Sequence, residues 1–179
     1  MKHLAATRML ILCAIAMTLC GAGIGNMYVQ KKGDSGWMFH IFSQKMPLLY
    51  GDAGKHMEYD YTFVEKTDSV SLLATVVCAG APKPVDMAVS YGDARYNRQP
   101  DLIYAKPKGE KTEYRLRLML PFETWDAMYG SVEPFVVSFG FSSGRDTMVA
   151  SYGLTGNKWR KNKEKIAVII GQIKLNTGK

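Results

Sequence analysis

The chain is poor in the residues that carry metal and redox chemistry, with three cysteines and three histidines among its 179 residues. Cys13 and Cys20 lie in an apolar N-terminal run, which leaves Cys78 alone in the rest of the chain. A disulfide scaffold and a four-cysteine zinc site are therefore excluded. Cys78 ends a run of alternating apolar residues that starts at Val70, and this position predicts a buried thiol rather than a nucleophile.

The sequence also lacks the motifs of common enzymes. His40 and His56 are the histidines outside the N-terminal run, and neither belongs to an H-E-x-x-H, G-x-S-x-G or P-loop motif. Glu58 and Asp60 have a spacing that would suit a calcium site or a glycosidase, but acids that alternate with tyrosines are typical of the solvent face of an outer strand. We therefore predict no metal, no cofactor and no catalytic residue. The alternative is an enzyme that the fold assembles around His40, His56, Glu58 or Asp60.

The one long apolar run of the sequence lies at the N-terminus. Residues 1–8 carry a lysine and an arginine without an acid, residues 9–19 are apolar, and small residues follow. This order predicts a secretory signal peptide, residues 1–22, that is cleaved after Ala22. We therefore expect an exported protein of the periplasm or the cell surface.

Two alternatives to cleavage stay open at the N-terminus. The apolar run can be followed as far as Val29, which is about the length of a membrane anchor, although its second half is rich in glycine. A lipoprotein would be acylated at Cys20, but Leu19 is larger than the residue that normally precedes such a cysteine.

Positive charge is concentrated at the C-terminal end. Residues 1–22 contain two of the 23 basic side chains and none of the 16 acidic ones, and residues 155–179 hold seven basic side chains against Glu164 alone. Because the body between them is nearly neutral, the net charge of +7 does not indicate a nucleic-acid-binding protein. The tail is instead a candidate contact for an anionic membrane surface, with Trp159 at the interface. Its candidate side chains are Lys158, Arg160, Lys161, Lys163 and Lys165.

Short segments of alternating apolar and polar residues fill the body of the chain. Gly- and Pro-containing turns separate them, and residues 93–100 are polar without alternation, which predicts a loop. Such a series predicts an all-β fold, an antiparallel β-sandwich or a partly closed barrel. The predicted strands are 57–64, 69–78, 85–91, 102–105, 112–120, 135–141 and 147–152.

Two helices are predicted beside the strands. A proline precedes and a glycine ends residues 122–130, which predicts a short helix. In residues 158–175 the apolar side chains recur every three or four positions, although many are β-branched, and we expect a C-terminal helix there. The chain then divides into the signal peptide, an N-terminal extension over residues 23–56 that leads into the sheet, and a β-sandwich domain over residues 57–179 whose basic tail is 155–179.

Four aromatic residues fall in predicted helix, loop or turn regions: Trp125, Tyr129, Trp37 and Tyr96. They are candidate contacts for a ligand or partner, unless they cover the open end of the core. The sequence thus favours a non-catalytic envelope protein that binds a protein or glycan partner or takes part in a surface assembly. An envelope hydrolase and a peripheral membrane protein are the alternatives, and the ligand itself does not follow from the sequence.

Overall fold

Alternating apolar and polar residues give most of the chain its strands. The computed structural model describes residues 26–179, so the predicted signal peptide lies outside the described residues. In chain order the elements are β1 (Tyr28–Gly33), β2 (Gly36–Gly51), β3 (His56–Val64), the 3-10 turn η1 (Glu65–Thr67), β4 (Ser69–Ala79), β5 (Lys83–Tyr91), β6 (Ala94–Arg98), β7 (Asp101–Lys108), β8 (Lys111–Pro121), α2 (Phe122–Gly130), β9 (Val136–Ser143), β10 (Asp146–Gly153) and α3 (Gly156–Thr177).

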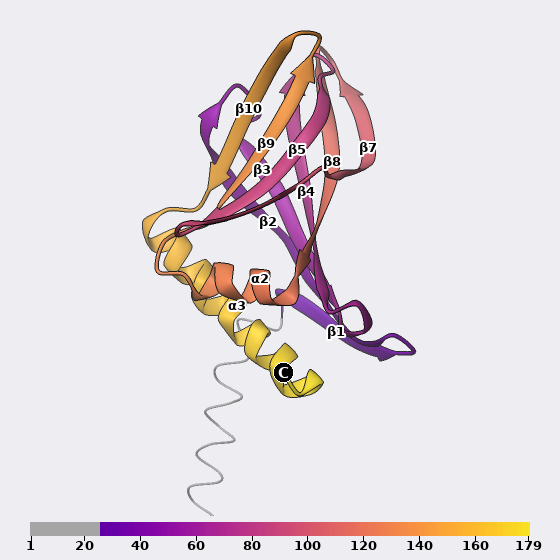
Figure 1. The fold of residues 1–179 in the computed structure, drawn as a ribbon, viewed down its shortest axis with the longest axis vertical. Helices are drawn as coiled ribbons and strands as arrows, with labels where there is room; N and C mark the ends of the chain where they lie inside the picture. Colours follow the sequence, from indigo (N-terminus) through magenta and orange to yellow (C-terminus); the bar gives the residue numbers. More distant parts are fainter. Residues whose placement is uncertain (1–25) are drawn as a thin grey trace, which may run out of the picture.

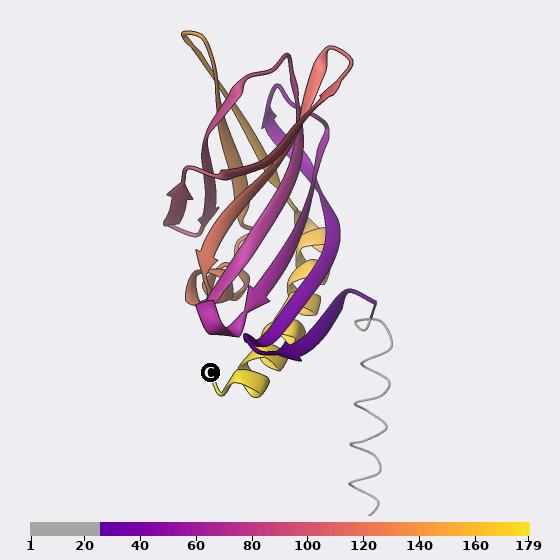
Figure 2. The same cartoon turned by 90° about the vertical axis from the view of Figure 1, so that its right-hand side faces the viewer.

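The strands form one antiparallel sheet that folds over on itself without closing (Figures 1 and 2). Their order is β6-β5-β9-β10-β2-β3-β4-β8-β7, and β1 pairs with the first half of β2. The last residues of β2 pair with β10 instead, so this long strand joins the two layers. A register shift between Ile41 and Gln44 marks a bulge in β2, and bulges increase the bend and twist of a strand.

The predicted all-β class with two helices is confirmed, and two details of the prediction are wrong. Residues 28–51 are not an extension that leads into the sheet, because β2 is an inner strand between β10 and β3. Residues 94–98 are not a loop, because they form the edge strand β6 after a tight turn at Gly92. An edge strand with both faces exposed to solvent shows no alternation of apolar and polar residues, so the sequence pattern did not predict this strand.

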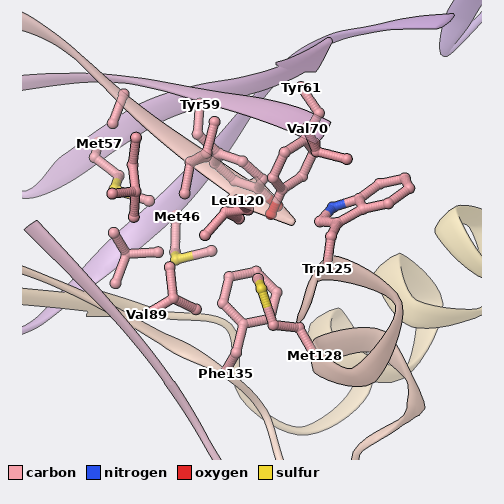
Figure 3. Packing of buried hydrophobic residues seen from close by; sticks show 14 of the residues in the cluster. Met46, Met57, Tyr59, Tyr61, Val70, Val89, Leu120, Trp125, Met128 and Phe135 are labelled. Atoms are coloured by element: carbon pink, nitrogen blue, oxygen red, sulfur yellow. The ribbon is translucent and has the colours of Figure 1, made fainter. Parts of the chain in front are cut away.

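The core lies between the two layers and is filled by side chains (Figure 3). In β8 every second residue from Thr112 to Leu120 is buried, as the alternation predicts. The open end of the folded sheet is rich in aromatic rings, and Trp125 of α2 lies among them with its ring centroid 5.4 Å from that of Tyr61. Large side chains therefore occupy the space that a ligand-binding barrel would leave empty.

The helices cover this open end. Helix α3 buries Trp159, Ile166, Ile169, Ile170 and Ile173 on one face, which confirms the predicted helix and its apolar stripe. Its Trp159 stacks on Tyr129 of α2, with 5.7 Å between the ring centroids. Within residues 26–179 neither helix combines the length and the apolar character that crossing a bilayer requires.

Candidate functional site

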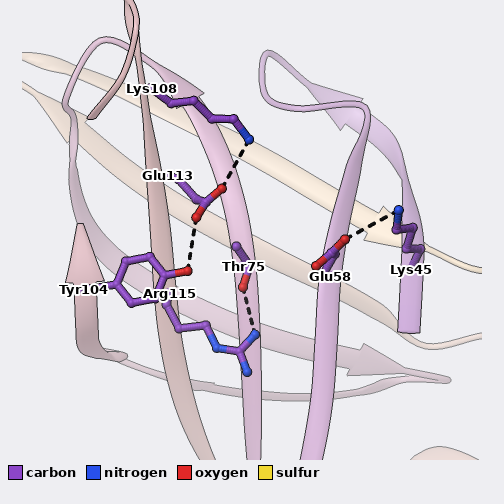
Figure 4. Close-up of polar contacts among 7 residues, drawn as sticks. All are labelled: Lys45, Glu58, Thr75, Tyr104, Lys108, Glu113 and Arg115. Atoms are coloured by element: carbon purple, nitrogen blue, oxygen red, sulfur yellow. Dashed lines mark hydrogen bonds and ion pairs between the residues drawn. The ribbon is translucent and has the colours of Figure 1, made fainter. Parts of the chain in front are cut away.

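Five neighbouring strands place one row of polar residues across the outer face of the sheet. Lys45 of β2 lies opposite Glu58 of β3, and Glu58 lies opposite Thr75 of β4. Thr75 in turn lies opposite Arg115 of β8, which lies opposite Tyr104 of β7. We call these five residues the polar row (Figure 4). On β3, β4 and β8 the residues before and after the member of the row are buried, so the row lies on the outer face of the sheet.

An ion pair and a hydrogen bond join four members of the polar row in two pairs. The Nζ atom of Lys45 lies 3.5 Å from Oε1 of Glu58, and both side chains are more than half exposed. Arg115 donates from Nη1 to Oγ1 of Thr75 at 2.8 Å. The row therefore presents a cation, an anion and a hydroxyl group at fixed cross-strand spacings.

Glu113 lies two residues before Arg115 on β8 and joins the row from the side. Its Oε1 accepts a hydrogen bond from the Tyr104 hydroxyl at 3.1 Å, and its Oε2 lies 3.4 Å from Nζ of Lys108. Because both oxygens have partners, the orientation of this carboxylate is set before any ligand arrives (Figure 4).

Asp60 holds Arg115 in place. Its Oδ2 forms an ion pair with Nη2 of Arg115, while the side chain of Asp60 is only 5% exposed and that of Arg115 is 21% exposed. The expectation that Glu58 and Asp60 both face solvent is therefore wrong for Asp60. The side chain of Arg115 extends from β8 and covers Asp60. The residue pattern of β3 alone could not predict this burial, because the covering residue lies on another strand.

The outer face is hollowed beside the polar row. The hollow has a volume of about 420 Å³, which is within the range of small-ligand sites. We call it the outer hollow. Its lining residues are Lys45, His56, Glu58, Thr75, Val77, Lys108 and Glu113.

The candidate acids and bases separate in the structure. His56 and Glu58 line the outer hollow together with Glu113. His40 instead lies on the outer face of β2, where its Nδ1 is 2.9 Å from Oγ1 of Thr62, and it does not line the hollow. Of the four residues in the enzyme alternative, the fold therefore brings two to one place.

The four aromatic candidates do not line the outer hollow either. Trp125 and Tyr129 are buried, and Tyr129 also lines a small hollow between α2 and α3. Trp37 is half-buried and packs beside Phe39, with 6.2 Å between the ring centroids. Tyr96 is also half-buried, and its hydroxyl donates to the carbonyl oxygen of Met119, which links the edge strand β6 to β8.

The basic residues of the C-terminal helix fall on different faces. Lys158, Lys161 and Lys165 line a second cleft, together with Gln44 and Lys45 of β2. Lys163 donates to the carbonyl oxygen of Ser131 at 2.7 Å and so binds the end of α2. Arg160 is exposed outside that cleft. Trp159 is buried in the core, so its expected place at a membrane interface is wrong.

The chemistry of the outer hollow is that of a polar binding surface. Three cationic side chains, Lys45, Lys108 and Arg115, are matched by three carboxylates, Glu58, Asp60 and Glu113. Within residues 26–179 no three histidine, cysteine or acidic side chains gather closely enough to hold a metal ion. Burial raises the pKa of the Cys78 thiol to about 11, and the nearby charge of Asp52 adds to this, so the thiol stays protonated at neutral pH.

Sequence reasoning missed most of this site. Thr75, Tyr104, Lys108 and Glu113 were not singled out, because each is an ordinary polar residue on a predicted strand or turn. The outward positions on each strand were available as a signal, but which of them meet depends on the register between strands. Comparison of the chain with protein-family models, with curated proteins and with solved structures finds no match in any of the three.

Proposed function

We propose that the protein is an exported bacterial envelope protein that binds a glycan in the outer hollow without chemical turnover. The observation that carries this proposal is the polar row, which places hydrogen-bond donors and acceptors next to one another across five strands. Carboxylates accept hydrogen bonds from sugar hydroxyls, and lysine and arginine donate to them. A glycan presents both kinds of group along one edge.

The balance of charge supports a neutral polar ligand over a strongly charged one. Two lysines and two glutamates line the hollow and offset each other, and the pair of Asp60 and Arg115 beside it is also neutral. Asp60 and Glu113 also have their charges paired within the protein, which keeps the donors in position while the hollow is empty of ligand. Tyr104 adds an aromatic side chain at the margin of this surface, where a sugar ring can pack.

Screening the purified protein on an array of immobilised bacterial oligosaccharides tests the proposal. We expect specific binding that falls at least about tenfold in Glu58→Gln and in Glu113→Gln, because a hydrogen bond to a charged group contributes about 1.5–3 kcal/mol. Glu123→Gln, which removes an acid of α2 outside the hollow, is the matched control and leaves binding unchanged. Absence of glycan binding, or equal losses in all three variants, would refute the proposal.

An envelope hydrolase is the second candidate, because His56 lies in the same hollow as Glu58 and Glu113. The glycan found on the array separates the two functions when it is incubated with the protein and followed by mass spectrometry. An intact glycan over many hours is the result expected of a binding module. Cleavage that His56→Ala abolishes would establish the hydrolase instead.

Export is the part of the proposal that rests on the N-terminal sequence. The positive, apolar and small segments in residues 1–25 support it. We expect the intact mass and the N-terminal sequence of the protein from fractionated native cells to give a soluble chain that starts at Gly23. An intact Met1 or a lipid on Cys20 would show a membrane-tethered protein, and recovery in the cytoplasm would refute export.

A further inference from the structure

A second concave site lies between β2 and the first half of α3, and it shares Lys45 with the outer hollow. It has a volume of about 410 Å³, and we call it the basic cleft. Three lysines of α3 line it, Lys158, Lys161 and Lys165, which recur at helical spacing and so share one face. Lys45 faces them from β2.

Three of the four charges of the basic cleft are not offset by an ion pair within the described residues. Among residues 26–179, Lys158, Lys161 and Lys165 form no ion pair, and Lys45 is bound only to the exposed carboxylate of Glu58. No acidic side chain is among the residues that line the cleft. Lysines that repel one another in this way are stabilised by an anion between them.

The floor of the cleft supplies an independent observation. Asn162 is 9% exposed and donates from Nδ2 to Oε1 of Gln44, which also accepts from the Tyr59 hydroxyl at 3.3 Å. Nε2 of Gln44 and Oδ1 of Asn162 are buried without a partner among the described residues. If both amides are turned over, one N–H group and one carbonyl oxygen still lack partners. The lysines therefore lie around a polar floor that keeps one unpaired donor and one unpaired acceptor.

We propose that the basic cleft binds the phosphate of an anionic lipid headgroup, which places this face of the protein on a membrane surface. Phosphate offers the negative charge and the acceptor oxygens that four lysines and an amide donor require. Met27, the second described residue, also lines the cleft and adds an apolar side chain to it.

Vesicle binding tests this assignment with the chain from Gly23 onward, which contains every described element and the whole described core. We expect the protein to sediment with vesicles that contain phosphatidylglycerol and to dissociate from them at high salt. It should not bind vesicles of phosphatidylcholine alone. The triple variant Lys158→Gln, Lys161→Gln, Lys165→Gln should bind at least tenfold more weakly. Gln44→Glu keeps the acceptor oxygen but adds a negative charge at the floor, and it should also weaken binding.

The matched control removes three other exposed cations in the variant Arg160→Gln, Lys111→Gln, Arg145→Gln. Its binding should stay within about threefold of the unchanged chain, although its net charge equals that of the cleft variant. Equal losses in the two triple variants would show a general charge effect and overturn the site, as would no binding to phosphatidylglycerol. Titration with inorganic phosphate is the second arm. Binding of free phosphate as strong as that of vesicles would overturn the lipid headgroup as the occupant.

Discussion

We expect Trp125→Ala to lower the free energy of unfolding by about 3–5 kcal/mol, because it removes the largest fully buried side chain from the core. The indole ring contacts three other aromatic side chains. Its centroid lies 5.4 Å from that of Tyr61, 6.0 Å from that of Phe122 and 5.8 Å from that of Tyr129. Alanine would leave a cavity where α2 meets the sheet, and the strands on both sides are held too firmly by their ladders to close it.

Urea unfolding followed by far-ultraviolet circular dichroism measures this effect. Trp125→Phe should cost less than Trp125→Ala, because it keeps most of the packing and removes an indole N–H that has no partner among the described residues. Val132→Ala is the control, since this side chain is 90% exposed and its loss should change the free energy by less than about 0.5 kcal/mol. A loss of under 1 kcal/mol in Trp125→Ala would contradict the observed packing.

The second large effect is a loss of stability at alkaline pH. Burial raises the pKa of Tyr61 and of Tyr129 well above the ordinary value of 10. The charge of Tyr59 raises the pKa of Tyr61 further, and the charges of Tyr61 and Tyr59 do the same for Tyr129. Burial also raises the pKa of Tyr59. In Figure 3 the Tyr59 and Tyr61 rings lie inside the packed core, where water does not solvate a phenolate.

The sign of the effect follows from proton binding. Below pH 10 these phenols keep their protons in both states, so their contribution to stability is fully present. Above pH 10 the unfolded chain releases the protons and the folded chain retains them, so stability falls as pH rises. Each tyrosine lowers the free energy of unfolding by about 1.4 kcal/mol per pH unit, and the three together by on the order of 4 kcal/mol at pH 11.

Urea unfolding at pH 8, 9, 10 and 11 gives the slope of stability against pH. Above pH 10 we expect Tyr129→Phe to make this slope less steep by the amount that corresponds to one proton released on unfolding. Tyr50→Phe, at a side chain that is 71% exposed, should leave the slope unchanged. Tyrosinate absorbance provides the opposing test. If the folded protein shows phenolate from Tyr59, Tyr61 and Tyr129 near pH 10, the three side chains are more accessible to solvent than the structure places them.

Local patterns were sufficient for most of the elements. The alternation along β3, β4, β8 and β9 identified these strands and the faces that they bury. A proline before and a glycine at the end of α2 marked that helix, and the spacing of the isoleucines marked α3. The pattern failed at β6, whose residues are polar on both faces, and in residues 28–51, where the bulge of β2 interrupts the alternation.

The candidate site was not predictable to the same extent. Glu58 and His56 were recognised as polar residues near a strand, but nothing in the sequence joined them to Glu113, which is 55 residues further along than Glu58. Asp60 was assigned to solvent, and it is buried because Arg115 reaches it from another strand. The register between strands determines which side chains meet across them, and this register depends on the whole sheet.

The sequence by itself determined the alternation of buried and outer residues, the two helices and the basic C-terminal stretch, because each depends on residues close together in the chain. Only the tertiary structure decided which residues share a surface. The strand pairing placed the five residues of the polar row next to one another. The packing of α3 placed three of its lysines toward β2, while Lys163 binds the end of α2. The physical reason is that a site needs groups from distant segments within a few ångströms, and only strand pairing and helix packing bring them there.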